Sequence, residues 1–415
     1  MTRRINPLNS FRTLPGDLRL LFLSTFLWAF GLGLYNYVWS IYLRDLNANP
    51  EQVGLVFSIG FVAGALTMIP GGILANKYEL RALLILGWAM SIPPPLMFYF
   101  AKSWVDVIPG LVLLQLSAFN LPALNAYISS AGDKQRIASA FGTVYASAPL
   151  GLVLSPAVGS ILLNWFQIRD LFLFSFLFFT VSTLVLFLVK RQPPREADSS
   201  SPKLELPKSS LEATILIFLA GTSIAFSIAS PFIPLYFQDI LRLNKSQIQL
   251  LGAAQSLGGA VFAILLGRMA ETRAQGGTMA FGLLLATIGL TGISLTGSLI
   301  VVPLMIFLFG AARAPGPVAY SILSHAPRAA SRAGRFGLYL TVDWLGFVAG
   351  SYIGGPLYTM NPSYVLAVSS LSFLALAVLS FFRIKAGRAQ GPPNEVAAWQ
   401  KIQTNPSSGT SAGRE

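Results

Sequence analysis

Residues 301–358 read VVPLMIFLFGAARAPGPVAYSILSHAPRAASRAGRFGLYLTVDWLGFVAGSYIGGPLY, and this stretch decides the fold class. Two apolar segments, each long enough to cross a bilayer, flank a short loop that contains Arg328, Arg332 and Arg335. Each segment carries one charge, Arg313 in the first and Asp343 in the second. An ionisable side chain inside a membrane span costs about 2.5–3.5 kcal/mol to insert, so we expect both charges to face a protein interior or a wet cavity and to have a partner.

The composition of the whole chain agrees with this local pattern. Of its 415 residues 54% are hydrophobic and only 11% are charged, and the mean hydropathy is +0.63. A soluble domain carries about 25% charged residues, so the chain is an integral membrane protein. The apolar runs are continuous rather than alternating, which favours an all-α protein over an outer-membrane barrel.

The apolar runs divide into two sets of six predicted transmembrane helices. We expect a bundle over 19–189 with spans at 19–43, 52–75, 82–101, 105–129, 137–163 and 170–189. A second bundle over 212–382 has spans at 212–237, 247–270, 279–297, 300–323, 336–358 and 364–382. The remaining segments are polar: a cytoplasmic N-terminal segment (1–18), a cytoplasmic linker rich in Pro, Ser and charge (190–211), and a disordered cytoplasmic tail (383–415).

The basic residues predict the orientation. With the N-terminus inside the cell, most Lys and Arg fall in cytoplasmic segments, and the outside receives Arg44, Lys102, Arg169, Arg242 and Lys245. We therefore expect a multi-pass protein of the cell membrane with both termini in the cytoplasm. The net charge of +13 follows from this orientation rather than from nucleic-acid binding. With no cysteine and one histidine, we expect no metal site and no cofactor.

A shift of about 195 residues aligns the two halves. NYVWSIYLRDL (36–46) falls on SPFIPLYFQDI (230–240), Asn120 on Arg313, and Tyr127 on Tyr320. The fifth helix of each half matches best: Gly142, Gly151, Ser155, Pro156, Gly159 and Ser160 have the spacing of Gly337, Gly346, Gly350, Ser351, Gly354 and Gly355. Asp343 falls on Ala148, so the first half has no acid in its spans. Such duplication is typical of secondary transporters that bind solute between two bundles.

With these motifs, the chain resembles the major facilitator superfamily over residues of about 15 to 385. The loop with Gly72, Asn76, Lys77 and Arg81 resembles the family's G-x3-D-R-x-G-R-R motif, with Asn76 at the acidic position. The glycine spacing of the fifth helix resembles the motif of drug:proton antiporters and efflux carriers, with Ser155 and Ser160 replacing two glycines. The resemblance implies two pseudo-symmetric six-helix bundles that work by alternating access, and a loop motif that gates them.

The glycines allow two compatible interpretations. Small residues let helices approach closely in lipid, so they pack the fifth and eleventh helices against neighbours. They also suit a sliding contact between the two halves.

The candidate site combines charge, amides and aromatic rings. Arg313 and Asp343 lie at similar depth and can meet, either as a structural ion pair or as a gated pair in which Asp343 takes up a proton or Arg313 binds an anion. Further candidates for lining a cavity share polar or aromatic character: Asn36, Gln115, Asn120, Tyr127, Tyr236, Gln255, Tyr320, Tyr339 and Trp344, with Trp28, Tyr35, Tyr37 and Tyr352. His325 stands at a helix end, where a solvated cap is the simpler reading than a proton relay.

We expect a monomeric secondary transporter in the lipid bilayer that exports a small solute coupled to protons. The alternative within transport is uptake or facilitated diffusion of a small anion held by Arg313. A membrane-embedded enzyme is disfavoured, because the spans lack paired acids, a metal cluster or an activated nucleophile. A non-transporting sensor would need a folded soluble output domain, and the linker and tail are the only soluble segments.

Overall fold

A computed structural model describes residues 14–132, 137–192, 210–324 and 332–384, and every regular element in these ranges is a helix. The first half comprises α2 (Gly16–Gly33), η1 (Asn36–Val38) and α3 (Trp39–Asp45); α4 (Pro50–Lys77); α5 (Leu80–Met90) and α6 (Pro93–Phe100); α7 (Val107–Leu116), η2 (Ser117–Asn120) and α8 (Leu121–Ala131); α9 (Ile137–Leu162); α10 (Ile168–Leu186). The second comprises α11 (Ser210–Ala229) and α12 (Ile233–Asp239); α13 (Lys245–Thr272); α14 (Gln275–Leu295); α15 (Val301–Phe309), η3 (Gly310–Arg313) and α16 (Pro315–Ser324); α17 (Arg332–Met360); α18 (Pro362–Arg383). The all-α fold is as predicted.

The number of membrane crossings depends on α17. Eleven helical segments among the described residues are long and apolar enough to cross a bilayer, and α17 is not one of them. At 29 residues α17 has sufficient length, but its six glycines and Asp343 lower its hydropathy. Since α17 is packed between α4, α11 and α18, it does not need an apolar surface all round, and it completes the two sets of six.

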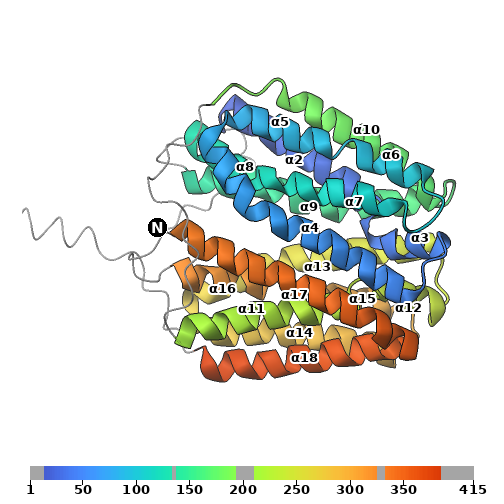
Figure 1. The fold of residues 1–415 in the computed structure, drawn as a ribbon. Coiled ribbons are helices and arrows are strands. Elements are labelled where there is room, and N and C mark those ends of the chain that lie inside the picture. The colour runs from blue at the N-terminus through green and yellow to red at the C-terminus, as the bar shows by residue number, and fades with distance from the viewer. Residues whose placement is uncertain (1–13, 133–136, 193–209, 325–331, 385–415) are drawn as a thin grey trace, which may run out of the picture.

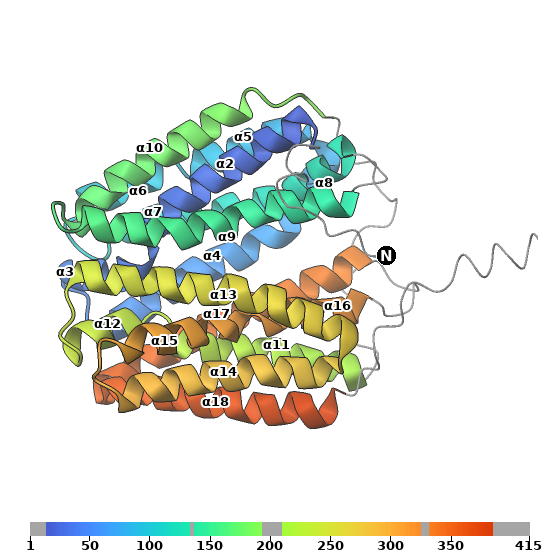
Figure 2. The same ribbon diagram turned by 180° about the vertical axis from the view of Figure 1, so that it is seen from behind.

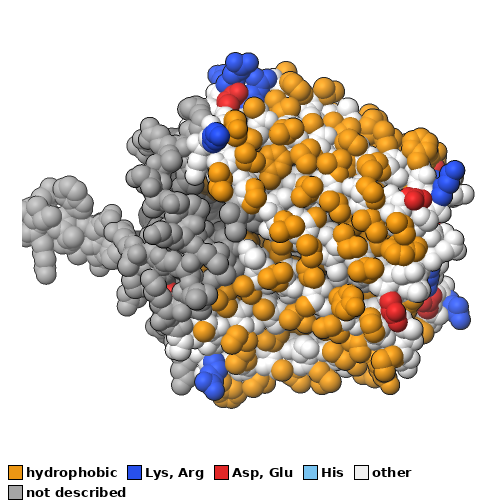
Figure 3. Space-filling view, in the orientation of Figure 1, with side chains coloured by type: hydrophobic (Ala, Val, Ile, Leu, Met, Phe, Trp, Pro, Cys, Tyr) orange, Lys and Arg blue, Asp and Glu red, His pale blue; other side chains and the backbone are white. Residues whose placement is uncertain are grey.

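On the face shown in Figure 3, hydrophobic side chains cover the middle, and the charged side chains lie toward the two ends. Leu66, Ile217, Leu371 and Phe381 are among the large apolar residues on the surface, each more than 60% exposed. A soluble protein rarely leaves so much contiguous apolar surface in water. The described surface is therefore suited to the hydrocarbon of a bilayer.

The two halves lie side by side, with α2–α10 above and α11–α18 below in Figures 1 and 2. We name the two ends of the molecule by the elements found there. The linker end holds the last turn of α10 and the first turn of α11, and the α3/α12 end lies opposite. Helix α2 begins and α18 finishes at the linker end (Figure 1). The predicted segments 1–18, 190–211 and 383–415 lie largely outside the described residues, so the domain limits stay predictions.

The duplication predicted from the sequence recurs in the backbone. Helices α4 and α13 are both 28 residues long and begin with the same capping box, Asn49 with Gln52 and Asn244 with Gln247. The turns before them each contain a non-glycine residue with positive φ, Asn47 at 65° and Arg242 at 55°. The fourth and tenth helices are each interrupted by a four-residue 3-10 turn, η2 and η3. These devices are local, so they are retained wherever the local sequence pattern is retained.

The halves are held together at the α3/α12 end. Helix α4 packs along α17, and α9 packs along α13. Gln249 of α13 is fully buried, and its Nε2 donates to the carbonyl oxygens of Gly33 at 2.9 Å and Leu34 at 2.8 Å. Two ion pairs join the halves nearby, Arg44–Asp239 at 2.5 Å and Lys245–Asp45 at 2.7 Å. In Figure 2, α9 and α13 diverge from this end toward the linker end.

Candidate substrate and coupling site

The structure brings Arg313 and Asp343 together with a serine from a third helix. Arg313 Nη2 lies 3.4 Å from Asp343 Oδ2, and Nη1 donates to Ser223 Oγ at 3.2 Å. The Ser223 hydroxyl in turn donates to Asp343 Oδ1. Each partner comes from a different segment of the second half: η3, α17 and α11. We call these three residues the ionic cluster.

The ionic cluster is buried on one side and open on the other. The Asp343 side chain is 9% exposed, whereas the Arg313 side chain is 44% exposed. The guanidinium carbon lies 4.5 Å from the centre of the Phe347 ring and 5.7 Å from that of Phe226, which are cation–π distances. Phe347 also packs on Phe61 of the first half, with ring centres 5.1 Å apart. The open side of Arg313 therefore lies beside the contact between the halves.

The break in the tenth helix positions Arg313. A Cβ atom added to Gly310 would lie 2.4 Å from the Gln255 carbonyl oxygen and 2.5 Å from the Gly259 nitrogen, so glycine lets η3 press against α13. Pro315 follows two residues after Arg313 and lacks the N–H group that a continuous helix needs. The tight turn and the close backbone approach together fix the direction in which Arg313 leaves the helix.

The glycines of α17 position Asp343. Added Cβ atoms at Gly346, Gly350 and Gly354 would meet the carbonyl oxygens of residues 220, 224 and 228 at 2.8, 2.4 and 2.7 Å, which all belong to α11. This face of α17 therefore lies directly against the backbone of α11. Asp343 is three residues before Gly346 on the same face, and this close packing brings it to Ser223.

Other glycines of the motif also allow close approach of helices, some within the first half and some at the contact between the two halves. Gly151 packs on α2, where an added Cβ would lie 2.8 Å from the Phe26 carbonyl oxygen. Gly159 approaches both Leu34 and Gln249, and Gly355 approaches the backbone of Glu51, so these two glycines lie at the contact between halves. Gly142 has open space around it, and Gly337 is outside the described side chains. Pro156 lies inside α9.

Several predicted cavity residues lie within the first half, away from the ionic cluster. Asn120 is buried against Gly87 of α5, and Gln115 Nε2 lies 3.4 Å from the Gly60 carbonyl oxygen. Tyr127 is fully buried, and its hydroxyl donates to the Lys190 carbonyl oxygen at 2.7 Å near the linker end. Trp28 stacks on Phe179 inside the bundle. Each of these contacts joins two segments of the first half.

The remaining candidates lie in several different places. Tyr339 is buried one turn before Asp343, and Trp344 lies across the interface against Gly64. Tyr236 is buried in α12 at the α3/α12 end, and Tyr35 packs among aromatic rings of the first half. Three further residues have exposed or half-buried side chains: Asn36, Gln255 and Tyr352. The side chain of Tyr320 and all of His325 lie outside the described residues.

The predicted loop motif makes contacts within the first half. Arg81 Nη2 donates to the Phe187 carbonyl oxygen at 2.5 Å, which ties the start of α5 to the end of α10. Lys77 Nζ lies 5.5 Å from the centre of the Tyr78 ring. Asn76 is exposed, and Gly72 has open space around it. A gating role for this motif stays a prediction.

Sequence reasoning missed Ser223, Phe226 and Phe347, which complete the surroundings of the charges. Ser223 and Asp343 are 120 residues apart in the chain, and a serine in an apolar helix carries no signal of its own. A weak signal was available, because Ser223 and Phe226 share one helical face with Ser227. Within the described part of the chain, no group of three or more acids or histidines is arranged to hold a metal ion.

The geometry defines a helical membrane protein with two packed halves and an ionic cluster beside their contact. The family model of the Major Facilitator Superfamily matches residues 21–222 and 213–410. The chain belongs to this superfamily.

Its relatives include proteins named as exporters. The multi-drug resistance efflux pump PmrA of Streptococcus pneumoniae is 29% identical over 239 residues, which are 54% of this chain and 59% of PmrA. The enterobactin exporter EntS of Shigella flexneri is 25% identical over 403 residues, 92% of this chain and 95% of EntS. The multidrug resistance protein MdtG of Serratia proteamaculans is 30% identical over 220 residues, 48% of this chain and 51% of MdtG.

Solved structures share the fold at low identity. A bacterial homologue of the human lysosomal transporter Spinster, in an inward-facing and occupied conformation, superimposes with a TM-score of 0.72 at 18% identity and covers 88% of this chain and 95% of that one. The nucleoside transporter NupG gives a TM-score of 0.69 at 16% identity, with 89% and 98% covered. At such identities the likeness shows the fold alone.

Proposed function

We propose that this protein is a secondary transporter that exports a small, partly apolar solute by alternating access, coupled to protons through Asp343. The observation that carries the proposal is the ionic cluster: a buried acid shared between Ser223 and Arg313, with aromatic rings on its open side. An intramembrane acid with one hydrogen-bonded partner and one charged partner is a typical coupling site. The superfamily membership and the relatives named as efflux pumps support the direction of transport.

Proton uptake by Asp343 would change the ionic cluster in a definite way. The charged carboxylate attracts the guanidinium and accepts the Ser223 hydroxyl. The neutral acid loses its attraction for Arg313, and the guanidinium is then held by Phe347, Phe226 and the solute. Since Phe347 packs on Phe61 of the other half, a shift of Arg313 is transmitted to the contact between α17 and α4.

In the proposed orientation the linker end and both termini are cytoplasmic, and the protein works as a monomer in the cell membrane. The α3/α12 end is then the outer side, which the ion pairs Arg44–Asp239 and Lys245–Asp45 keep closed. Opening to the outside requires these pairs to separate. Both pairs are partly exposed, so water can replace their contacts at modest free-energy cost.

The second candidate is uptake or facilitated diffusion of a small anion. The 44% exposure of Arg313 favours it, because a half-open guanidinium over an aromatic face can hold a carboxylate or phosphate group. In this reading Asp343 orients Arg313 and does not carry protons.

Dye transport in proteoliposomes tests both readings, with ethidium as an aromatic cation and carboxyfluorescein as an aromatic anion. For proton-coupled export, an imposed pH gradient drives dye flux in the wild type. Asp343→Asn abolishes this response but retains exchange without a gradient. For the anion reading, Arg313→Gln abolishes carboxyfluorescein flux, and the pH gradient has no effect.

Asp106→Asn is the matched control. The backbone N–H groups of Lys102 and Ser103 donate to this exposed acid and lower its pKa, so Asp106 stays ionised near neutral pH and should not couple. A gradient response that survives Asp343→Asn would overturn the coupling role. If no dye is transported and no compound in a thermal-shift screen stabilises the protein, the transport proposal fails.

A further inference from the structure

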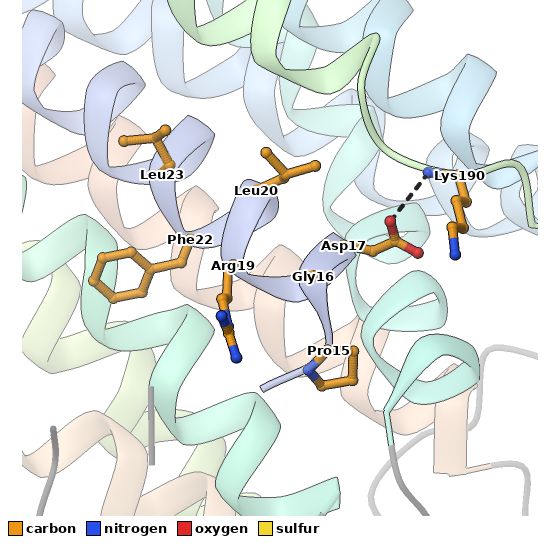
Figure 4. A pocket seen from close by; sticks show the side chains of 8 residues that line it. All are labelled: Pro15, Gly16, Asp17, Arg19, Leu20, Phe22, Leu23 and Lys190. Carbon is orange, nitrogen blue, oxygen red and sulfur yellow. Dashed lines mark hydrogen bonds between the residues drawn. The ribbon is translucent and has the colours of Figure 1, made fainter. Parts of the chain in front are cut away.

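Helix α2 is held differently at its two ends. At its start, Asp17 accepts a hydrogen bond from the backbone N–H of Lys190 at 3.4 Å, and both residues lie at the linker end (Figure 4). At its other end, the side chain of Gln249 from the second half donates to the carbonyl oxygens of Gly33 and Leu34. Of these contacts, those of Gln249 join the two halves, so they must break when the halves separate at the α3/α12 end.

The carbonyl groups that Gln249 binds are available because α2 ends at Gly33. A helix leaves its last carbonyl groups without partners inside the helix. Gln249 Nε2 lies 2.9 Å from the Gly33 oxygen and 2.8 Å from the Leu34 oxygen, which uses both hydrogens of the amide. Gly159 of α9 leaves room for this amide, because a Cβ atom added there would lie 3.0 Å from Nε2. One side chain of the second half therefore caps a helix of the first half.

Gln249 differs from the ion pairs at the same end in its burial. The residue is 0% exposed, whereas the side chains of the pairs Arg44–Asp239 and Lys245–Asp45 are between 30% and 42% exposed. A hydrogen bond that water does not reach has no substitute partner until the halves separate. We therefore expect the Gln249 contacts to resist opening more than either ion pair does.

The same region contains polar atoms that favour opening. Gln249 Oε1 and the Tyr37 hydroxyl are buried and have no hydrogen-bond partner among the described residues. The Tyr37 ring lies at the contact between halves, because a Cβ atom added to Gly252 of α13 would lie 2.5 Å from its Cγ atom. A buried polar atom without a partner costs free energy, which is recovered when water reaches it. The closed end is thus stabilised by two hydrogen bonds and destabilised by two polar atoms.

We propose that Gln249 is a latch that favours the state closed at the α3/α12 end, and that Tyr37 opposes it. The proposal rests on the alternating access of the proposed function, but it is independent of the solute, the direction of transport and the coupling ion. Gln249→Leu removes two hydrogen bonds and should favour opening. Tyr37→Phe removes a hydroxyl without a partner and should favour closure. A role in packing alone would not give the two substitutions opposite signs.

A single engineered cysteine measures opening, because the chain has no cysteine of its own. Ser58 of α4 is 5% exposed, and its Oγ donates to the Val348 carbonyl oxygen of α17 at 3.0 Å, so Ser58→Cys places a thiol between the halves. The rate at which a maleimide labels this thiol in detergent follows the open population. In this background, Gln249→Leu should be labelled about sevenfold faster, as expected for two hydrogen bonds between membrane helices. Tyr37→Phe should be labelled at least about fivefold more slowly.

Ser175→Ala is the matched control. Ser175 of α10 also donates to a carbonyl oxygen of α2, that of Gly31 at 2.8 Å, but this bond lies within the first half and survives opening. The labelling rate of the Ser58→Cys background should therefore not change. In a separate background, Ser182→Cys places a thiol in the buried interior of the first half, where labelling reports unfolding, and it should stay unlabelled in every variant.

The two latch variants are read independently, so Tyr37→Phe keeps the test valid if Gln249→Leu does not fold. Unchanged labelling in both variants, or changes of the same sign, would overturn the latch. Opposite changes in a protein that transports neither dye would support the latch and overturn only the proposed export.

Discussion

The two halves of this protein share a backbone plan and differ at the ionic cluster. In the second half, Ser223, Arg313 and Asp343 form the ionic cluster. A shift of about 195 residues puts Trp28, Asn120 and Ala148 at the corresponding positions of the first half. Trp28 fills its position with an aromatic ring, stacked on Phe179 at 5.7 Å and close to Trp88 at 6.5 Å.

This difference distinguishes the residues that maintain the fold from the residues that form the candidate site. The capping boxes, the 3-10 breaks and the glycine faces occur in both halves, so they serve folding and helix packing. The charges occur in one half, so they are not needed for the architecture. A duplicated fold thus shows which polar residues are candidates for function, without any comparison to other proteins.

The largest expected effect on stability comes from truncating Trp28, which occupies the first-half position that corresponds to Ser223. Trp28→Ala removes a stacked ring from the interior, and we expect a loss of about 4 kcal/mol in the free energy of unfolding, with a large fall in the midpoint of thermal unfolding in detergent. Ser223→Ala, at the matching position, should cost much less. If both changes had the same effect, the contrast between a packing half and a functional half would be wrong.

The next effect concerns charge. Arg313→Gln leaves Asp343 without its cation, and we expect about 2 kcal/mol of destabilisation, reduced from the value for fully buried pairs because Arg313 is partly exposed. Adding Asp343→Asn should restore most of the loss, since no uncompensated charge remains. A double-mutant cycle on thermal unfolding measures the coupling, and additive effects would contradict a real pair.

The glycine faces allow a finer comparison. Gly350→Ala places a Cβ atom 2.4 Å from a carbonyl oxygen of α11, whereas Gly151→Ala places it 2.8 Å from one of α2. We expect losses of about 2 and 1 kcal/mol respectively, because overpacking forces the backbones apart. Gly142→Ala, where no atom lies within 4 Å, should be neutral or slightly stabilising. Equal gains in stability at all three positions would show that helix propensity, which favours alanine over glycine, and not packing decides the outcome.

The smallest expected loss of stability comes from removing one interhelical serine hydrogen bond, and this loss should be the same in both halves. Ser175 donates to the Gly31 carbonyl oxygen at 2.8 Å, and Ser369 donates to the Ala225 carbonyl oxygen in the matching place. Replacing either serine by alanine should cost about 0.6 kcal/mol, as is usual for hydrogen bonds between membrane helices. Losses that differ by more than twofold between Ser175→Ala and Ser369→Ala would show that the halves are less alike than their backbones.

The sequence by itself determined the membrane class, the helical segments and the duplication. Continuous apolar runs leave the backbone no partner but itself, so helices follow from composition and length. The alignment of Asn120 with Arg313 also reappears, because both residues end a 3-10 turn before a proline-containing helix. The prediction that Arg313 and Asp343 can meet came from depth alone, which helix rise fixes.

Only the tertiary structure decided which residues meet at that depth. The depth of a residue in the membrane does not fix the rotation of its helix about its own axis. Tyr127 and Asn120 were therefore predicted to line the same cavity as Arg313, although they face the interior of their own half. Rotation is set by close backbone contacts such as Gly350 against α11, and these depend on surfaces more than 100 residues apart in the chain. For the same reason Ser223 and Gln249, whose local sequence signal is weak, were found only once the helices were packed.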